Sequence, residues 1–216
     1  MLWLLVWCGV MAGPTMADSI VKLPSPDTVG EVTVEQALWH RRSVRTYAED
    51  SLSLEQVGQV VWSAQGWTRG PIGRTAPSAG ATYPMELYLV AGKVKGLKAG
   101  LYHYGLDGHF LKLVKRGDLR VQLADAALSQ GSILAAPAVL VLAADYSRTA
   151  KRYGERAPRY VHMEAGHIGE NVHLQCEALG LGTVMIGAFD DERVKKLLGI
   201  EQEPLYIMPV GKKKPE

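Results

Sequence analysis

Several features that define common protein classes are scarce or missing in this chain. Two cysteines in 216 residues exclude a small secreted scaffold held together by disulfides. The net charge is only +2 and no basic stripe is visible, so nucleic-acid binding is not expected. Hydrophobic residues make up 47% and charged residues 21%, which argues against a disordered or multi-pass membrane protein. Length and composition together indicate one globular domain, with or without an extension.

The usual nucleotide and metal motifs are also missing. The sequence has neither a P-loop nor the glycine-rich turn of a dinucleotide-binding βαβ unit. Two Glu-x-x-His pairs, Glu164/His167 and Glu170/His173, share one expected helix and lie six residues apart. That spacing rotates one pair by about 240° from the other, so they cannot converge on one ion. We therefore expect no metal site.

A serine nucleophile is a remote alternative. Ala76–Gly80 is a loose relative of the Gly-x-Ser-x-Gly elbow, with Ser78 at its centre. That elbow needs a strand before the serine and a helix after it. Here a loop rich in glycine precedes Ser78 and a strand is expected after it, which disfavours a hydrolase.

The first seventeen residues differ from the rest of the chain. Residues 1–17 contain no charged side chain, begin with an apolar block, and end in Thr15-Met16-Ala17, which resembles a signal-peptidase site. The apolar block is too short to span a bilayer. We expect a signal peptide at 1–17, an exported and periplasmic protein, an extended arm at 18–32 and one domain at 33–216. The alternatives are a hydrophobic N-terminal segment of a cytoplasmic protein and a misassigned start codon.

Mixed helix and strand patterns follow. Capping boxes at Thr33/Gln36 and Ser53/Gln56 predict two helices, and the long loop at 66–81 is rich in small and turn-forming residues. The order is not a regular βαβ alternation, so it favours an α+β fold. The remaining expected elements are strands at 86–91, 101–104, 109–114, 138–144, 183–186 and 205–210, and helices at 118–129, 159–179 and 190–198.

The helix at 159–179 carries two glycines beside its apolar stripe. Gly166 and Gly169 lie in its interior, where each glycine costs about 1 kcal/mol relative to alanine. Their presence predicts close approach of another segment, either from the same chain or across a subunit interface. The stripe itself comprises Val161, Ala165, Ile168, Val172, Cys176 and Leu179.

A cationic cluster ends the first helix. Arg41, Arg42 and Arg45 place three guanidiniums within five residues, together with the Ser43 hydroxyl. Arginine is well suited to bidentate contact with phosphate. A solvated basic turn is the alternative, and the cluster alone does not decide between them.

The order of the motifs over most of the chain resembles the nitroreductase family, in its SagB-type dehydrogenase branch. Arg-Arg-Ser-Val-Arg at 41–45 is similar to the opening flavin motif of that family. The other matching stretches, in the same order, are 75–84, 160–171, 180–182 with 187–191, and 209–211.

The resemblance implies an α+β fold with a central, mostly antiparallel sheet flanked by helices, and a homodimer with one FMN at each interface. It implies that the cationic cluster holds the phosphate and ribityl chain, and that residues from the partner subunit line the flavin. By position, the implied FMN-binding residues are Arg41, Arg42, Ser43, Arg45, Pro77, Ser78, Gly187, Ala188 and Lys212. Gly187-Ala188 stands where many members carry Glu-Gly, and Lys213 or Lys214 are alternatives to Lys212.

The implied activity is two-electron transfer through FMN in alternating half-reactions, to or from a small organic or peptide substrate. The SagB-type branch uses a Lys-Tyr pair in proton transfer. Here Arg152-Tyr153 occupies that place, and arginine cannot act as a base, which leaves Tyr153 as the implied proton donor. For a cytoplasmic protein the implied electron donor is NAD(P)H. For an exported protein it is a redox partner protein. A flavin-binding or partner-binding module without turnover is the alternative function.

Overall fold

The computed structural model describes residues 20–70 and 73–214, so the expected signal at 1–17 lies outside the described residues. A seven-stranded sheet in the order β1-β4-β3-β2-β5-β7-β6 forms the centre. Each neighbouring pair of named strands is antiparallel. The expected α+β fold is therefore confirmed. The strands are β1 (Ile20–Lys22), β2 (Met85–Ala91), β3 (Gly100–Gly105), β4 (Phe110–Arg116), β5 (Ala138–Ala144), β6 (Leu181–Thr183) and β7 (Glu203–Lys212).

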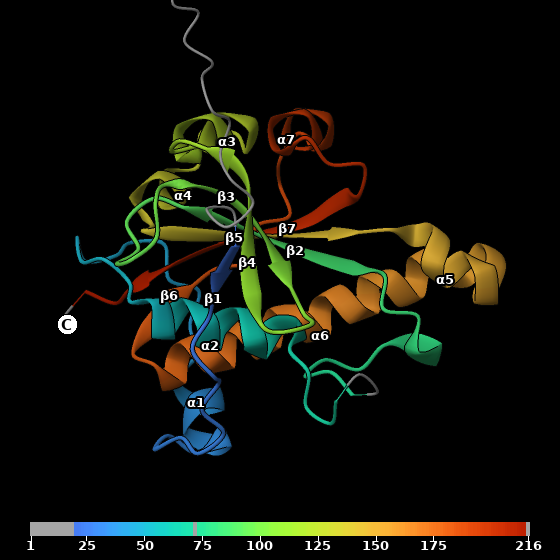
Figure 1. Ribbon diagram of the computed structural model, residues 1–216, viewed down its shortest axis with the longest axis horizontal. Helices are drawn as coiled ribbons and strands as arrows, with labels where there is room; N and C mark the ends of the chain where they lie inside the picture. Colours follow the sequence, from blue (N-terminus) through green and yellow to red (C-terminus); the bar gives the residue numbers. More distant parts are fainter. Residues whose placement is uncertain (1–19, 71–72, 215–216) are drawn as a thin grey trace, which may run out of the picture.

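Helices cover both faces of this sheet (Figure 1). One face is covered by α1, α2 and α6, and the other by α3, α4 and α7, while α5 projects beyond one end of the sheet. The helices are α1 (Val34–His40), α2 (Leu54–Gln65), α3 (Arg120–Ala126), α4 (Gly131–Ala135), α5 (Tyr146–Tyr153), α6 (Ala157–Ala178) and α7 (Asp191–Leu198). Short 3-10 turns occur at Ala79–Ala81 (η2) and Gly154–Arg156 (η3).

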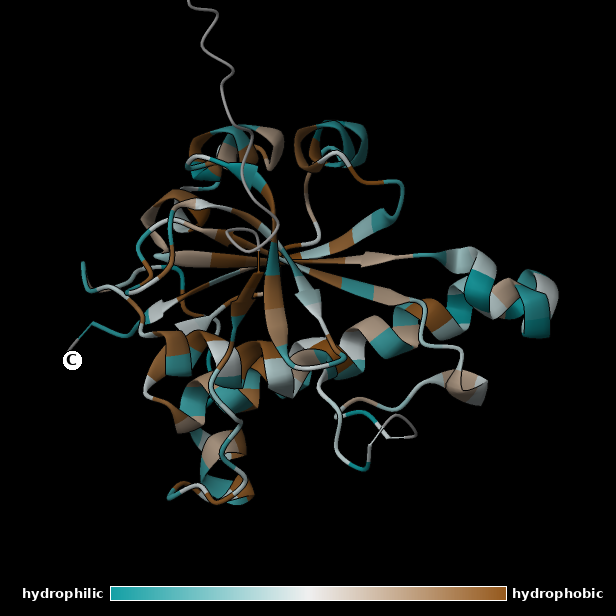
Figure 2. Ribbon diagram, in the orientation of Figure 1, coloured by the Kyte–Doolittle hydropathy of each residue, from teal (hydrophilic) through white to brown (hydrophobic). Residues whose placement is uncertain are grey.

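The central strand β5 shows why the molecule has two cores. Successive side chains of a strand point to opposite faces. Leu140 and Leu142 belong to the core beneath α2 and α6, whereas Val139 and Val141 belong to the core beneath α3, α4 and α7. Each residue of β5 is buried, which explains its uninterrupted apolar sequence. Figure 2 shows the hydrophobic colour concentrated in the sheet and on the inner sides of the helices.

The two predicted capping boxes are confirmed. The Thr33 hydroxyl accepts from Gln36 N at 3.2 Å, and Thr33 N donates to Gln36 Oε1 at 2.9 Å. Ser53 and Gln56 repeat the arrangement at the start of α2, with distances of 3.2 and 3.0 Å. These reciprocal bonds satisfy backbone donors that a helix start leaves unpaired.

Some boundaries differ from the expectation. The strand expected at 183–186 is found as β6 at Leu181–Thr183, and Ile186 instead makes an isolated bridge with Ile207. The helix expected at 118–129 ends earlier because Leu128 and Ser129 adopt positive φ, which breaks helical geometry. Two helices, α4 and α5, were not expected. The segment expected as an arm begins with β1, which pairs with β4.

The two glycines of α6 have different surroundings. A Cβ atom at Gly169 would collide with Sδ of Met185 in the same chain, so the close approach there is within one protomer. A Cβ at Gly166 would meet nothing within 4 Å. Only Gly166 therefore leaves open space on the outer face of α6. Within the described residues, none of the helices is long and apolar enough to cross a membrane.

Candidate functional site

The cationic segment Arg41–Arg45 leaves the end of α1 and runs beside β6. Arg41 N donates to Ala37 O at 2.9 Å and closes the helix. Val44 N then donates to Thr183 O at 2.8 Å, and Ser43 forms a parallel bridge with Thr183. Backbone bonds to the sheet therefore fix the position of the cluster, although its sequence reads as a loop.

Close packing against two glycines holds the same segment in place. A Cβ at Gly182 would lie 2.6 Å from Val44, and one at Gly211 would lie 2.7 Å from Tyr47. The Tyr47 hydroxyl donates to Val44 O at 2.8 Å and lies 3.2 Å from Pro209 O. Gly182 of β6 and Gly211 of β7 therefore allow the segment to pack closely against the sheet, because a side chain at either position would displace it.

The three guanidiniums differ in how far they are already engaged. Arg41 Nε lies 3.7 Å from Glu170 Oε1, a long ion pair. Arg42 Nη1 donates to the carbonyls of Trp39 and Arg41, at 2.9 and 2.8 Å. Within the described part of the chain, the exposed Arg45 has no acidic partner. Arg45 is therefore the side chain most available for an anion.

Two buried groups lie next to the cluster. His173 on α6 is only 4% exposed, and burial lowers the pKa of its imidazole to about 4, with the Arg41 charge acting in the same direction and Glu177 against it. The imidazole is therefore neutral at pH 7. Thr183 Oγ1 is buried and has no hydrogen-bond partner among the described residues. The exposed guanidiniums of Arg42 and Arg45 and the exposed Ser43 between them are groups that suit a phosphorylated, hydroxyl-rich ligand.

The lysines at the end of β7 are close to this segment but already paired. Ala48 N donates to Lys212 O at 3.0 Å, which ties the two segments together. Lys212 Nζ lies 3.1 Å from Asp50, and Lys213 Nζ lies 2.6 Å from Glu177. Lys212 can contribute charge to an anion only by leaving Asp50.

The second motif forms the loop around Ser78, fastened to three helices. Asn171 Nδ2 of α6 donates to Thr75 O at 3.1 Å. Arg74 Nη1 donates to Gln65 Oε1 of α2 at 2.6 Å. The hydroxyls of Thr82 and Thr149, the latter on α5, lie 2.9 Å apart.

Within this loop Pro77 is exposed and Ser78 is half-buried. The Ser78 hydroxyl accepts from Tyr83 N at 2.9 Å, and the Arg74 guanidinium stacks on the Tyr83 ring, 4.0 Å from its centroid. The loop therefore presents Pro77 on its outer side over a hydrogen-bonded interior. Arg74 was not singled out in the sequence, since nothing near it in the chain marks it.

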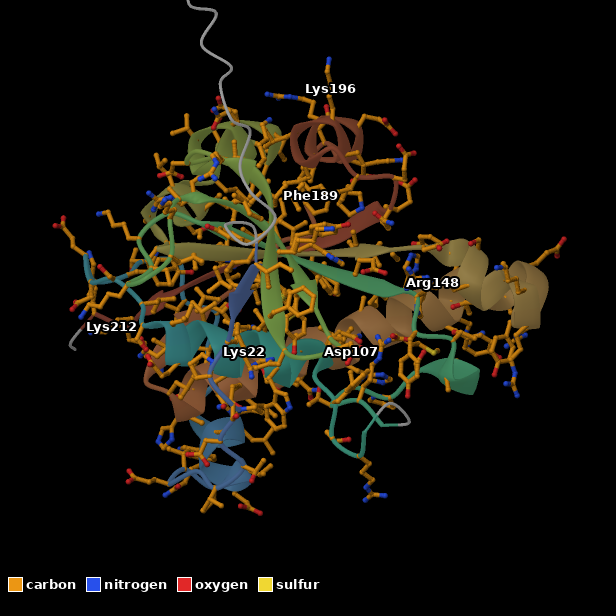
Figure 3. The ribbon with its side chains drawn as sticks, viewed as in Figure 1. Lys22, Asp107, Arg148, Phe189, Lys196 and Lys212 are labelled. Carbon is orange, nitrogen blue, oxygen red and sulfur yellow. The ribbon has the colours of Figure 1, made fainter. Side chains whose placement is uncertain are left out.

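Tyr153 packs against the same loop. Its hydroxyl would lie 2.7 Å from a Cβ at Gly80, and the neighbouring Arg152 donates to Gly80 O at 3.2 Å. The Tyr153 ring also contacts Tyr160, with centroids 4.7 Å apart. Figure 3 shows Lys212 and Arg148, a residue of α5, at opposite ends of the molecule. Within one protomer, Tyr153 at the end of α5 and Lys212 at the end of β7 therefore cannot contact the same ligand.

Gly187 and Ala188 lie in the exposed connection between β6 and α7. Gln130 Nε2 donates to Ala188 O at 2.9 Å and fixes the direction of that peptide. A Cβ at Gly187 would meet only the Tyr206 ring, at 3.9 Å. The backbone at these two residues is therefore accessible from solvent, with space beside Gly187.

A charged network that the sequence did not reveal joins β2, β3 and α5. Glu86 accepts from His103 Nε2 at 2.7 Å and forms an ion pair with Arg148. Arg148 Nε also lies 3.3 Å from Asp145. Burial acts to raise the pKa of the Glu86 carboxyl, but the bonds from His103 and Arg148 hold it below its ordinary value. The network anchors α5 to the sheet.

The fold and this site define an α+β protein with an exposed cationic segment built onto the edge of its sheet. No group of three or more metal-ligating side chains occurs in the part of the chain that the structure describes. The chain belongs to the nitroreductase family: the sequence model of that family matches residues 38–212. It is accordingly an oxidoreductase of that family.

Individual relatives agree with this assignment. The chain is 42% identical over 198 residues to a candidate nitroreductase of Methanocaldococcus jannaschii, covering 92% of this chain and 99% of the relative. A crystal structure of a candidate nitroreductase from Ralstonia eutropha superimposes with a TM-score of 0.79 at 26% identity, covering 96% and 97% of the two chains. A chain of the E. coli microcin synthetase complex with truncated pro-MccB17 bound has the same fold, with a TM-score of 0.69 at 19% identity, covering 96% of this chain and 85% of that one.

Proposed function

We propose that the protein is an FMN-dependent oxidoreductase that transfers two electrons in separate half-reactions. The observation that carries this proposal is the cationic segment. Its exposed Arg45 has no acidic partner in the described part of the chain, and the exposed Ser43 follows Arg41 and Arg42 in the same segment. Membership of the nitroreductase family supports it independently.

Each implied residue has a role that its geometry permits. Arg41 and Arg45 would neutralise the phosphate, and Ser43 would offer its hydroxyl to the ribityl chain. Arg42 mainly supports the segment, because its guanidinium already donates to two carbonyls. Lys212 adds charge at longer range.

The bound FMN would supply hydride acceptance and donation, which no side chain of this protein can provide. The exposed backbone at Gly187 and Ala188 would leave room for the flavin ring. Tyr153 holds a proton beside Gly80, where it can be given to a reacting substrate. Proton transfer by a positioned side chain typically contributes 10²–10⁴-fold to a rate.

A homodimer is part of the proposal. Trp39 is 77% exposed and Leu38 53% exposed on α1, and the Gly166 face of α6 is open. A second copy of the chain would cover these apolar side chains. It would also bring its own Pro77 and Ser78 to a flavin held by the cationic segment of the first copy.

The substrate is proposed to be a small organic molecule or a peptide. The microcin synthetase relative was solved with truncated pro-MccB17 bound, which supports the peptide option. NAD(P)H is the proposed donor in the cytoplasm, and a redox partner protein would replace it after export. Mass spectrometry of the protein from its native cells distinguishes the two locations. Removal of residues 1–17 supports export, and an intact Met1 in the cytoplasmic fraction excludes it.

Purified protein tests the main proposal directly. We expect a visible flavin spectrum, bleaching with NADPH or dithionite, and reoxidation by a quinone or nitroarene. Protein that binds no FMN after reconstitution would refute the proposal. A flavin that is reduced but passes its electrons to none of these acceptors would favour the second candidate, a flavin-binding or partner-binding module without turnover. That candidate rests on Gly187-Ala188 and Arg152, which depart from the family pattern.

A further inference from the structure

A second group of cations lies where α5 meets the beginning of α6, and the proposed function gives it no role. Lys151, Arg152, Arg156 and Arg159 are all exposed. In the described part of the chain, none of these four side chains has a carboxylate partner. Glu155 is the only acidic residue between positions 151 and 159. The group therefore carries a net positive charge that no carboxylate in contact with it balances.

Two of these cations are fixed on either side of a pair of tyrosine rings. Arg152 Nη1 donates to Gly80 O at 3.2 Å, and its guanidinium carbon lies 5.7 Å from the centroid of the Tyr153 ring. Arg156 Nε donates to the Tyr160 hydroxyl at 3.3 Å, and its guanidinium carbon lies 5.8 Å from the centroid of that ring. The centroids of the two rings are 4.7 Å apart. The two guanidiniums therefore flank one aromatic pair.

These two guanidiniums have most of their hydrogen-bonding capacity left. A guanidinium has five N–H donors. Within the described residues, Arg152 and Arg156 each use one of them, in the bonds just given. Arg148, one turn earlier on α5, shows the contrast. Its guanidinium pairs with Glu86 and donates to Tyr83 O at 3.1 Å. Arg152 and Arg156 are thus held in place by one bond each and keep further donors for an incoming acceptor, which lowers the entropy that binding would cost.

The aromatic pair places these donors beside the reacting region of the proposed function. Tyr153 is the side chain to which that function assigns a proton. Gly80, which accepts from Arg152, belongs to the same loop as Ser78. Helix α5 projects beyond the sheet and packs along α6 at that end of the molecule (Figure 1), and the cations on it are exposed. A substrate that reaches Tyr153 therefore passes within reach of the two arginines.

We propose that Arg152 and Arg156 form a subsite for a carboxylate group of the substrate. The proposal rests on the proposed function and specifies its substrate class, an anionic organic molecule or a peptide with acidic side chains. A guanidinium can give a carboxylate two parallel N–H bonds, which a lysine cannot. Arginine at position 152, where the resembling branch has lysine, thus supplies binding geometry in place of a group that can accept a proton.

A matched pair of probes tests the subsite with or without FMN. In saturation-transfer NMR titrations of the purified full-length protein, benzoate should bind and its uncharged isostere benzamide should bind more weakly. Arg152→Gln and Arg156→Gln should each weaken benzoate binding about fivefold, the size of a well-formed exposed charge pair, and leave benzamide unchanged. Glu155→Gln should strengthen benzoate binding, because it removes the only acid of the group. Arg116→Gln, at the exposed end of β4, is the control and should change neither.

Competition experiments distinguish the two sources of the carboxylate. Displacement of benzoate by a capped tetra-aspartate peptide at lower concentration than by succinate assigns the subsite to an acidic peptide, and the reverse order assigns it to a small organic acid. A tetra-asparagine peptide should displace no benzoate. Equal binding of benzoate and benzamide by the native protein, or benzoate binding that neither arginine variant weakens, would overturn the proposal.

Turnover then tests the connection with the reaction. With FMN-loaded protein and a saturating electron donor, we expect a lower KM for 4-nitrobenzoate than for 4-nitrobenzamide. Both arginine variants should raise the KM for 4-nitrobenzoate alone and leave its kcat unchanged. A KM for 4-nitrobenzoate that stays native in both variants would overturn the role in substrate binding. Protein that binds no FMN, or reduces neither nitroarene, refutes the proposed function instead, and the NMR titrations still decide whether the subsite exists.

Discussion

Gly182 and Val44 approach each other so closely that a single methyl group cannot fit between them. A Cβ at Gly182 would lie 2.6 Å from the Val44 side chain, while Val44 N donates to Thr183 O at 2.8 Å. The contact joins the segment that carries the arginines to strand β6. The strand therefore supports the cationic segment.

Replacing Gly182 by alanine should weaken FMN binding. The added Cβ must push Val44 and its segment away from β6, and overpacking of this kind typically costs 1–3 kcal/mol. Fluorescence titration with FMN and urea unfolding measure the two effects. Gly30→Ala is the control, because a Cβ at Gly30 meets nothing within 4 Å. Unchanged FMN affinity in Gly182→Ala would show that the segment does not hold the cofactor.

Loss of Arg45 should reduce FMN affinity at least tenfold. Hydrogen bonds to charged groups contribute about 1.5–3 kcal/mol each, and every 1.4 kcal/mol corresponds to a factor of ten. The double variant Arg41→Ala/Arg45→Ala should purify almost free of flavin. Arg116→Ala, at the exposed end of strand β4, removes one positive charge elsewhere, and this variant should retain its flavin. Full occupancy in the double variant would contradict the assignment.

Gly166→Leu should convert the dimer to a monomer and lower its flavin content. The position is open within one protomer, so the larger side chain should disturb only a second copy. Analytical ultracentrifugation measures the change. Gly169→Leu is not a test of the dimer, because it collides with Met185 of its own chain. A Gly166→Leu protein that stays dimeric would place the interface elsewhere.

Acid should destabilise the protein partly through His173. Its pKa is lowered from 6.5 to about 4 on folding, so between these values the unfolded chain binds a proton that the folded chain does not. The free energy of unfolding therefore falls as pH decreases through this window, by at most about 1.4 kcal/mol per pH unit. Urea unfolding should show a shallower loss in His173→Gln. Identical slopes for the two proteins would assign the acid sensitivity to the carboxylates.

Tyr153→Phe should slow turnover without releasing FMN. The variant removes a hydroxyl beside Gly80 and keeps the ring that packs on Tyr160. Steady-state kinetics with a reconstituted protein should show a lower kcat at unchanged flavin content. Tyr160→Phe removes the neighbouring hydroxyl and should be close to native. Equal rates in Tyr153→Phe and the native protein would leave Tyr153 a packing residue.

Local signals carried most of the sequence-based prediction of the fold. The capping box at Ser53/Gln56 marked the start of α2, and the apolar run at 138–144 marked β5 to the residue. Helix α5 was not predicted because Tyr146–Tyr153 is short and mostly polar. Its position depends on Arg148, whose partner Glu86 lies far away in the sequence. Such tertiary support cannot be recognised from one segment alone.

The site was predictable only in part for the same reason. Arg41–Arg45 is compact in the sequence and could be recognised from its charges. The hydrogen bond from Asn171 to Thr75 O, and the stacking of Arg74 on Tyr83, depend on how α6 and the loop are brought together. The resemblance to a family pointed to Ser78 but gave no reason to consider Arg74.

Helix α6 fixes the spacing between two parts of the site, because it contacts both of them. Tyr160 contacts Tyr153, which packs against the Ser78 loop, and Glu170 lies 3.7 Å from Arg41. Insertion of one residue between them would advance one contact by about 1.5 Å and turn it by about 100° around the axis. Both attachments could not survive that change. Natural variation in length should therefore be tolerated in the surface loops of this chain and excluded between positions 160 and 170.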